Sequence, residues 1–153
     1  MGLMRDLGHG PVGVDTAIFI YFIEEHPSFL SLLEPLFREV DAGRIELLTS
    51  ALTLLEVLVF PYRSGDHLLA ERYESILTRS RGVHMADISR DHLRAAAQLR
   101  AATGLKTPDS LQLIAALAGG CTVFLTNDRG PEESRTNGTM MNGPGKSATW
   151  IPK

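Results

Sequence analysis

The strongest constraint on the fold is an alternation of two patterns along the chain. Four short apolar runs, at residues 11–14, 45–49, 83–86 and 121–125, are separated by stretches in which apolar residues recur every three or four positions. Runs this short are typical of buried strands, and the intervening periodicity is typical of amphipathic helices. Strands joined through helices pair in parallel, because a parallel pair needs a long crossover connection. The alternation therefore predicts an α/β domain around a mostly parallel sheet.

Helix boundaries are predicted from capping residues and from residues that break helices. The sequence predicts helices over residues 17–25, 27–40, 50–60, 68–81, 87–103 and 107–118. Ser50 and Thr107 are suitable N-caps, and Pro108 fits the first helical position. Pro61 and Gly65 are expected to break the pattern after residue 60.

The composition fits one globular domain followed by an atypical tail. A chain of 153 residues with 44% apolar and 22% charged residues lies near ordinary globular values. From residue 131 onward, Gly, Asn, Thr, Ser and Met replace the periodic apolar residues. We therefore expect a domain over residues 1–130 and a mobile tail over residues 131–153, with at most a short strand at residues 148–151.

Several classes of protein are disfavoured by what the sequence contains. The single cysteine, Cys121, cannot form a disulfide framework, and the five histidines show no metal-ligand spacing. Cys121 begins a predicted buried strand, so a structural thiol is expected, and His84 and His92 are expected to be surface or satisfied residues. The apolar stretches are too short to span a membrane, and residues 1–10 do not resemble a signal peptide, so we expect a cytoplasmic protein.

The net charge argues against a broad surface for nucleic acid. A net charge of -3 and an isoelectric point near 5.9 leave no general basic footprint. A protein of this charge that binds RNA needs a local basic surface. Among the many arginines, Arg129 alone is tied by sequence to the acidic positions described next.

Four acidic residues occupy positions that call for an explanation. Asp15 and Asp128 directly follow predicted strands, at the sheet edge where open α/β proteins bind ligands. Asp109 lies in the first turn of a predicted helix, and Glu56 stands within an apolar segment. Each has an ordinary alternative: Asp15 as a helix N-cap, Asp109 as a helix-dipole partner, Asp128 as a turn residue, and Glu56 as the partner of a distant arginine.

Taken together, the four acids predict a metal site. Carboxylates that converge on one sheet edge repel one another unless a cation is present. Magnesium and manganese prefer oxygen ligands, and magnesium commonly binds through a few carboxylates together with substrate phosphate. Such a site suits metal-assisted hydrolysis of a phosphodiester bond.

Four motifs in the chain resemble those of the PIN-domain ribonucleases. They are V-D-T at residues 14–16, L-L-E-V-L at 54–58, T-P-D-S-L-Q-L-I-A-A-L at 107–117 and F-L-T-N-D-R at 124–129. Their order and spacing also match, over about residues 12–130, and the similarity is greatest to the VapC-like toxins of toxin-antitoxin pairs. Each motif is short and only moderately specific, whereas four in the right order are improbable by chance.

The resemblance implies a fold, an activity and partners. The implied fold is a three-layer α/β/α sandwich with a mostly parallel sheet of four to five strands. The implied activity is cleavage within RNA that depends on Mg2+ or Mn2+, with Asp15, Glu56, Asp109 and Asp128 as catalytic residues and metal ligands. Neighbouring polar residues that match the family are candidates for orienting the carboxylates or a bound water: Thr16, Thr126 and Asn127. The implied partners are an antitoxin protein and a second copy of the chain.

Two other classes of protein and a non-catalytic form of this one are the alternatives. A phosphatase with an aspartyl nucleophile usually has a second acid two residues after the first, and that position here is Ala17. A receiver-type signalling domain needs an early pair of aspartates and a late lysine, which this order of motifs does not supply. A degenerate PIN domain that binds RNA or protein without cutting is the serious alternative: the four intact acids argue against it, and the atypical tail argues for it.

Overall fold

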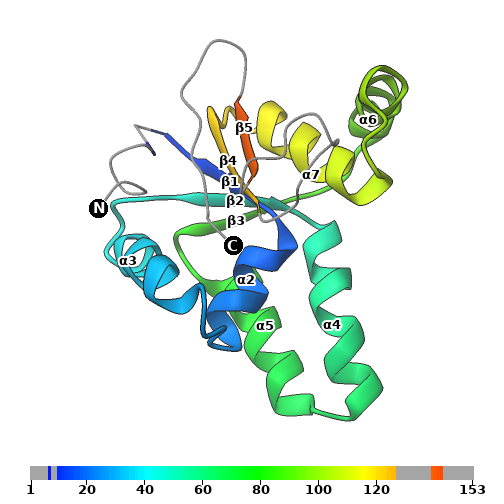
Figure 1. The fold of residues 1–153 in the computed structure, drawn as a ribbon. Coiled ribbons are helices and arrows are strands. Elements are labelled where there is room, and N and C mark those ends of the chain that lie inside the picture. Colours follow the sequence, from blue (N-terminus) through cyan, green and yellow to red (C-terminus); the bar gives the residue numbers. More distant parts are fainter. Residues whose placement is uncertain (1–6, 8–9, 127–138, 143–153) are drawn as a thin grey trace.

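The computed structural model describes residues 7, 10–126 and 139–142 of the chain. Within these residues, five strands form one sheet in the order β3-β2-β1-β4-β5 (Figure 1). The strands are β1 (Val12–Val14), β2 (Leu47–Ser50), β3 (Val83–Ala86), β4 (Val123–Thr126) and β5 (Thr139–Asn142). The helices are α2 (Thr16–Ile23), α3 (Leu30–Asp41), α4 (Leu52–Ser64), α5 (His67–Arg79), α6 (Arg90–Thr103) and α7 (Thr107–Ala118).

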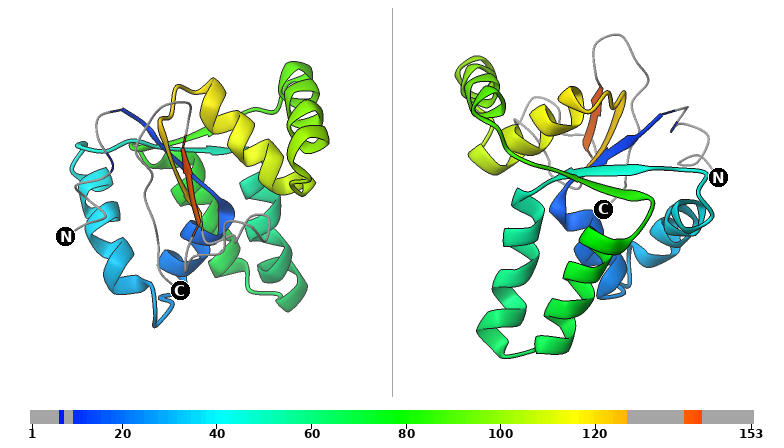
Figure 2. Two further views of the ribbon diagram at one scale, coloured as in Figure 1. Left: turned by 45° about the horizontal axis from the view of Figure 1, so that its top comes forward. Right: turned by 180° about the vertical axis from the view of Figure 1, so that it is seen from behind.

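The sheet is parallel except at one edge, and helices cover both of its faces. Strands β1 to β4 pair in parallel, whereas β5 is antiparallel to β4. Helices α2, α3, α4 and α5 lie on one side of the sheet, and α6 and α7 lie on the other (Figure 2). The predicted three-layer α/β/α sandwich is therefore confirmed.

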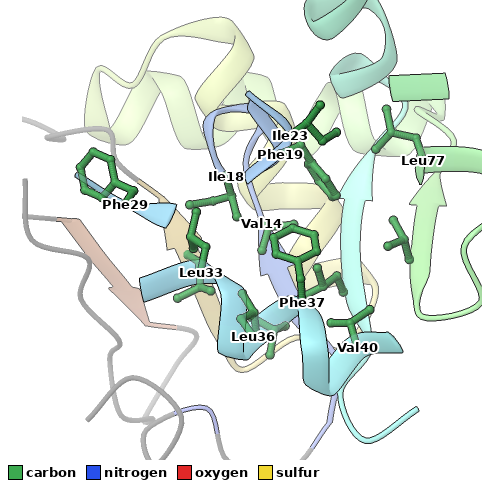
Figure 3. Close-up of a cluster of buried hydrophobic side chains, with 14 of the residues drawn as sticks. Val14, Ile18, Phe19, Ile23, Phe29, Leu33, Leu36, Phe37, Val40 and Leu77 are labelled. Carbon is green, nitrogen blue, oxygen red and sulfur yellow. The ribbon is translucent and has the colours of Figure 1, made fainter. Parts of the chain in front are cut away.

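Successive side chains of a strand point to opposite faces of the sheet, so the core is divided into two clusters. Val12 and Val14 of β1 belong to the larger cluster with residues of α2, α3 and α5, and Figure 3 shows Val14 among them. The aromatic rings of Phe22 and Phe37 stack within this layer, with centroids 3.9 Å apart. On the opposite face, Phe124 packs with Ala116 of α7 in a smaller cluster. Burial on both faces explains why the strand sequences are continuous apolar runs.

Gly13 allows β1 and α7 to approach closely. A Cβ atom at this position would lie 2.7 Å from the Cβ of Ala116 and 2.8 Å from Cδ2 of Phe124. These distances are shorter than carbon atoms tolerate, so a larger residue would separate the two elements. Because α7 carries Asp109, this contact also sets the position of that acid relative to β1.

We predict that Gly13→Ala lowers the free energy of unfolding by about 1 to 3 kcal/mol, because it overpacks a rigid contact. The urea midpoint of the variant should fall accordingly. Ala118→Ser, at an exposed position on the same helix, should leave the midpoint within error of the parent protein. An unchanged midpoint in Gly13→Ala would contradict the close packing.

Helix α4 extends beyond its predicted end at residue 60. Pro61 lies inside the helix, which continues to Ser64 and stops at Gly65 in a left-handed conformation, with φ of 73°. A proline removes only the hydrogen bond of its own nitrogen, and the residues after it can still donate to the preceding turn. Gly65 adopts the positive φ that ends the helix at little cost, so the prediction that Pro61 ends it was wrong.

Strand β5 was not predicted from the sequence. Thr139–Asn142 pairs with β4 in antiparallel register, with Thr126 opposite Thr139, at a place where the sequence analysis expected no strand before residue 148. Backbone pairing at the edge of an existing sheet requires little apolar periodicity, which explains why the pattern did not indicate it. The domain boundary at residue 130 and the mobility of the tail stay predictions, since residues 127–138 and 143–153 lie outside the described part of the chain.

Among the described residues, no helix is both long enough and apolar enough to cross a membrane.

Candidate active site

Asp15 lies at the carboxyl end of β1, beside the end of β4. Its backbone N–H donates to the Leu125 carbonyl at 3.1 Å, and its carboxylate accepts a hydrogen bond from the Thr126 hydroxyl. The side chain is only 8% exposed. Asp15 is also the N-cap residue of α2, yet its side chain makes no capping hydrogen bond. Helix capping therefore does not account for this carboxylate.

Glu56 faces the same region from α4. Its Oε1 atom accepts a hydrogen bond of 2.7 Å from the Thr16 hydroxyl, and the residue is half-buried. Within the described part of the chain, no arginine or lysine forms an ion pair with Glu56, so the alternative of a distant arginine partner is not realised there. Among the apolar residues near Glu56 in sequence, Val57 is buried, whereas Leu55 and Phe60 are 61% and 60% accessible.

Asp109 enters the site from the first turn of α7. Lys106 is the N-cap of this helix, so Thr107 and Pro108 stand one position further into it than predicted. The half-buried Asp109 lies where the positive end of the helix dipole favours a carboxylate. The dipole fits Asp109 as a structural residue and equally as a ligand.

A pocket of about 350 Å³ brings the three acids together. Its lining includes Asp15 after β1, Glu56 from α4 and Asp109 from α7. The remaining lining residues are Thr16, Ala17, Ile20, Tyr21, Pro108 and Gln112. The structure thus places three of the four predicted acids around one cavity at the predicted edge of the sheet. Asp128 and Asn127 lie outside the described residues.

The donor set suits a hard divalent cation. All three acids offer carboxylate oxygens, which Mg2+ and Mn2+ prefer. In the described residues, no three His, Cys, Asp or Glu side chains lie close enough together to hold a metal ion. Magnesium is commonly held by one or two carboxylates, with water and substrate phosphate completing its shell. The residues around the pocket therefore fit such an ion without forming a closed cage.

Two threonines donate hydrogen bonds to the carboxylates, which is the contact expected of residues that position an acid. The Thr16 hydroxyl donates to Glu56, and the Thr126 hydroxyl donates to Asp15. Thr126 is buried and ends β4, so its position is set by the sheet. Their roles in catalysis stay predictions.

A buried polar group at the wall of the pocket was not predicted from the sequence. Gln112 of α7 is 3% exposed, Thr53 of α4 is fully buried, and the amide nitrogen of Gln112 donates to the Thr53 hydroxyl at 2.7 Å. A usable signal was present, because Gln112 follows Asp109 by three positions and Thr53 precedes Glu56 by three. Residues three apart share a helix face, so Gln112 is expected on the same face as Asp109, and Thr53 on the same face as Glu56.

Cys121, His84 and His92 are not among the residues that line the pocket. Cys121 is buried, and burial raises the pKa of its thiol to about 11, so the thiol stays protonated at neutral pH. Nδ1 of His92 accepts from the Ser89 backbone as part of a capping box that begins α6. His84 lies 3.6 Å from Glu46 on the surface. Arg129 lies outside the described residues.

Comparison with known proteins gives one family and several related folds. The sequence model of the PIN domain family matches residues 12–134. The comparison with curated proteins finds no match. Among solved structures, VapC20 of Mycobacterium tuberculosis, described as a toxin that cleaves the sarcin-ricin loop, is similar with a TM-score of 0.63 and 16% identity, covering 78% of this chain and 90% of that one.

Two further solved structures are complexes. VapBC2 of Rickettsia felis, bound to a DNA fragment from its promoter, is similar with a TM-score of 0.59 and 21% identity, covering 78% of this chain and 89% of that chain. A toxin-antitoxin complex from Klebsiella pneumoniae is similar with a TM-score of 0.56 and 20% identity, covering 78% and 87% of the two chains. At these identities the likeness establishes the fold.

Proposed function

The chain belongs to the PIN domain family, and from that premise we propose that it is an endoribonuclease that requires Mg2+ or Mn2+. The observation that carries the proposal is the pocket at the carboxyl edge of the sheet, which is lined by one acid after β1, one from α4 and one from α7. A concentration of negative charge beside a cavity has no evident use in packing. Bound to a divalent cation, the same charge organises an anionic phosphate.

Asp15 and Asp109 are the proposed direct ligands of the cation, and Glu56 and Asp128 complete the proposed acidic set. When bound, the cation neutralises charge on the carboxylates and on the scissile phosphate. Glu56 lines the same pocket and is half-buried, so it can orient an attacking water or accept its proton. Asp128 and Asn127 are assigned from the family motif alone.

The hydroxyl groups of Thr16 and Thr126 fix two of these acids. Each donates to a carboxylate oxygen, and so each restrains the orientation of that side chain. Positioning of this kind raises the rate because the acids need no reorganisation when substrate binds. We assign both threonines, and Asn127 by its place in the motif, to the support of the acidic residues.

The biological role that we propose is that of the toxin of a toxin-antitoxin pair. The folds of three solved toxins or toxin-antitoxin complexes support this role. Helix α4 also exposes large apolar residues next to Glu56: Leu55, Val59, Phe60 and Tyr62. An apolar surface beside an active site is typical of a face that a partner covers. We accordingly propose an antitoxin partner and a homodimer.

The direct test is incubation of the purified protein with single-stranded RNA labelled at one end. We expect internal cuts with Mg2+ or Mn2+ and none with excess EDTA, because clustered carboxylates alone repel a phosphate. DNA of the same sequence serves as the control for substrate class. Cleavage that continues in excess EDTA would refute the metal requirement. Binding of RNA without cleavage under every metal condition would support the alternative of a non-catalytic PIN module.

A further inference from the structure

Gln112 connects four elements at the wall of the acidic pocket. It lies on α7, and its side-chain amide reaches β2, α4 and α2. The amide oxygen accepts from the Ser50 backbone N–H at 3.1 Å and from the Thr49 hydroxyl at 3.3 Å. The amide nitrogen donates to Thr53 at 2.7 Å and to Thr16 at 3.3 Å. All four hydrogen-bonding positions of the amide are therefore in use.

The orientation of this amide is fixed by the backbone of β2. A backbone N–H only donates, so the Gln112 atom that faces Ser50 has to be the oxygen. The NH2 group then has to face the hydroxyls of Thr53 and Thr16. Rotation of the amide by half a turn would place its NH2 group against the Ser50 N–H. Two buried donors would then face each other without an acceptor. The β2 backbone therefore sets the direction in which Gln112 donates.

The direction in which Gln112 donates determines which group receives the hydrogen of the Thr16 hydroxyl. A hydroxyl has one hydrogen, and Thr16 already receives a hydrogen from Gln112. The carboxylate of Glu56 only accepts while it is ionised, so the single hydrogen of Thr16 points to Oε1 of Glu56 at 2.7 Å. The hydrogen bonds therefore all point the same way: the Ser50 N–H donates to Gln112, Gln112 donates to Thr16, and Thr16 donates to Glu56.

The neighbouring threonines complete the network, but their three hydroxyl hydrogens cannot serve all four hydroxyl contacts, so the Thr16 and Thr53 oxygens, 3.2 Å apart, have no hydrogen between them. Thr49 uses its hydrogen on the amide oxygen of Gln112, and Thr53 then donates to Thr49, whose oxygen is 2.7 Å away. Thr49 and Thr53 are nine-tenths buried or more, as is Gln112. A fully satisfied polar network in so dry a place holds its members in one arrangement.

We propose that Gln112 is a positioning residue that orients the Thr16 hydroxyl toward Glu56 and so holds that carboxylate ready for the reaction. This inference rests on the proposed ribonuclease function for its kinetic consequences, but not for the geometry. Gln112 acts here through Thr16. All four hydrogen bonds of its amide go to protein groups, so it supports the site through them.

The test compares Gln112→Met, which keeps the volume and removes the amide, with Ser110→Ala on the same helix. Ser110 is fully buried, and its hydroxyl donates to the Thr107 carbonyl, so its loss controls for removing a buried polar group from α7. We expect Gln112→Met to lower kcat for RNA cleavage by about tenfold with little change in KM, as loss of a supporting hydrogen bond does. Ser110→Ala should retain the parent kcat.

A double-variant cycle separates positioning from general loss of structure. If Gln112 acts through Thr16, then Gln112→Met should cost little further activity in a Thr16→Val background, whereas Thr16→Ser should retain most activity. Additive losses, or an equal loss in Ser110→Ala, would overturn the proposal. Should Gln112→Met fail to melt cooperatively, Gln112→Glu replaces it in the same cycle, because it keeps the shape and removes both N–H donors.

A measurement without substrate keeps this inference distinct from the proposed function. The 1H–15N signals of the Gln112 side-chain amide should shift in Thr16→Val and remain in place in Ser110→Ala. Signals that do not respond to Thr16→Val would refute the coupling even in an active nuclease. A parent protein that shows the coupling and cuts no RNA would refute the ribonuclease proposal alone.

Discussion

Asp109→Asn and Asp15→Asn are each expected to lower RNA cleavage by roughly a hundredfold to a thousandfold, the size of effect that follows removal of one preorganised charge from an active site. Asparagine keeps the shape of the side chain and removes its charge, so packing around β1 and α7 should change little. The measurement is the single-turnover rate with saturating Mn2+. Both residues line the same pocket, and neither replacement removes a large apolar contact.

The matched control is Asp91→Asn. Asp91 is an exposed carboxylate on α6 whose partner is Arg94, and it is absent from the pocket lining. The exposed pair contributes little to stability, so this variant should cleave RNA at the parent rate. Full activity in Asp15→Asn would remove that residue from the proposed mechanism. Equal losses in all three variants would point to an effect of net charge on RNA binding.

The parallel sheet was predictable because its strands are buried on both faces. Val12 and Val14 face one helical layer and Gly13 faces the other, so β1 reads as a continuous apolar run followed by Asp15. The same reasoning places Asp109 in the first turn of a helix that contains Pro108. These assignments depend on local residue types, and local residue types are what a single sequence displays.

Contacts between distant segments could not be read from the sequence. Nothing in the residues around Thr16 indicates that its hydroxyl meets Glu56, which is 40 positions away. The network of Gln112 depends on the register of β2 against α7, and register is a property of the folded sheet. Strand β5 likewise follows from the free edge of β4, because its own residues show little strand periodicity.

The environment of Glu56 shows how an interpretation can change while the residue stays in the site. Its apolar neighbours suggested a carboxylate buried within a core helix, which needs a compensating partner. In the structure, Leu55 and Phe60 are largely exposed, and Glu56 is half-buried at a pocket with the Thr16 hydroxyl as its donor. The apolar character of α4 therefore reflects an outer surface as well as a core.

Divalent metal is expected to stabilise the folded protein, and this prediction does not depend on any substrate. A cation that binds only the native acidic pocket adds about 2.7 kcal/mol at a hundredfold excess over its dissociation constant. For a domain of this size, the melting temperature should rise by roughly 5 to 10 °C. Differential scanning calorimetry in Mn2+ and in EDTA measures the shift.

The double variant Asp15→Asn with Asp109→Asn should lose most of this response, since it removes both proposed direct ligands. Without metal it should melt at or above the temperature of the parent protein, because neutral side chains end the repulsion that the carboxylates exert on one another and on Glu56. Asp91→Asn should keep the full metal response. A shift that survives the double variant would place the cation elsewhere on the chain. A double variant that melts well below the parent in EDTA would show that the two aspartates serve the fold itself, through contacts such as the hydrogen bond from Thr126 to Asp15.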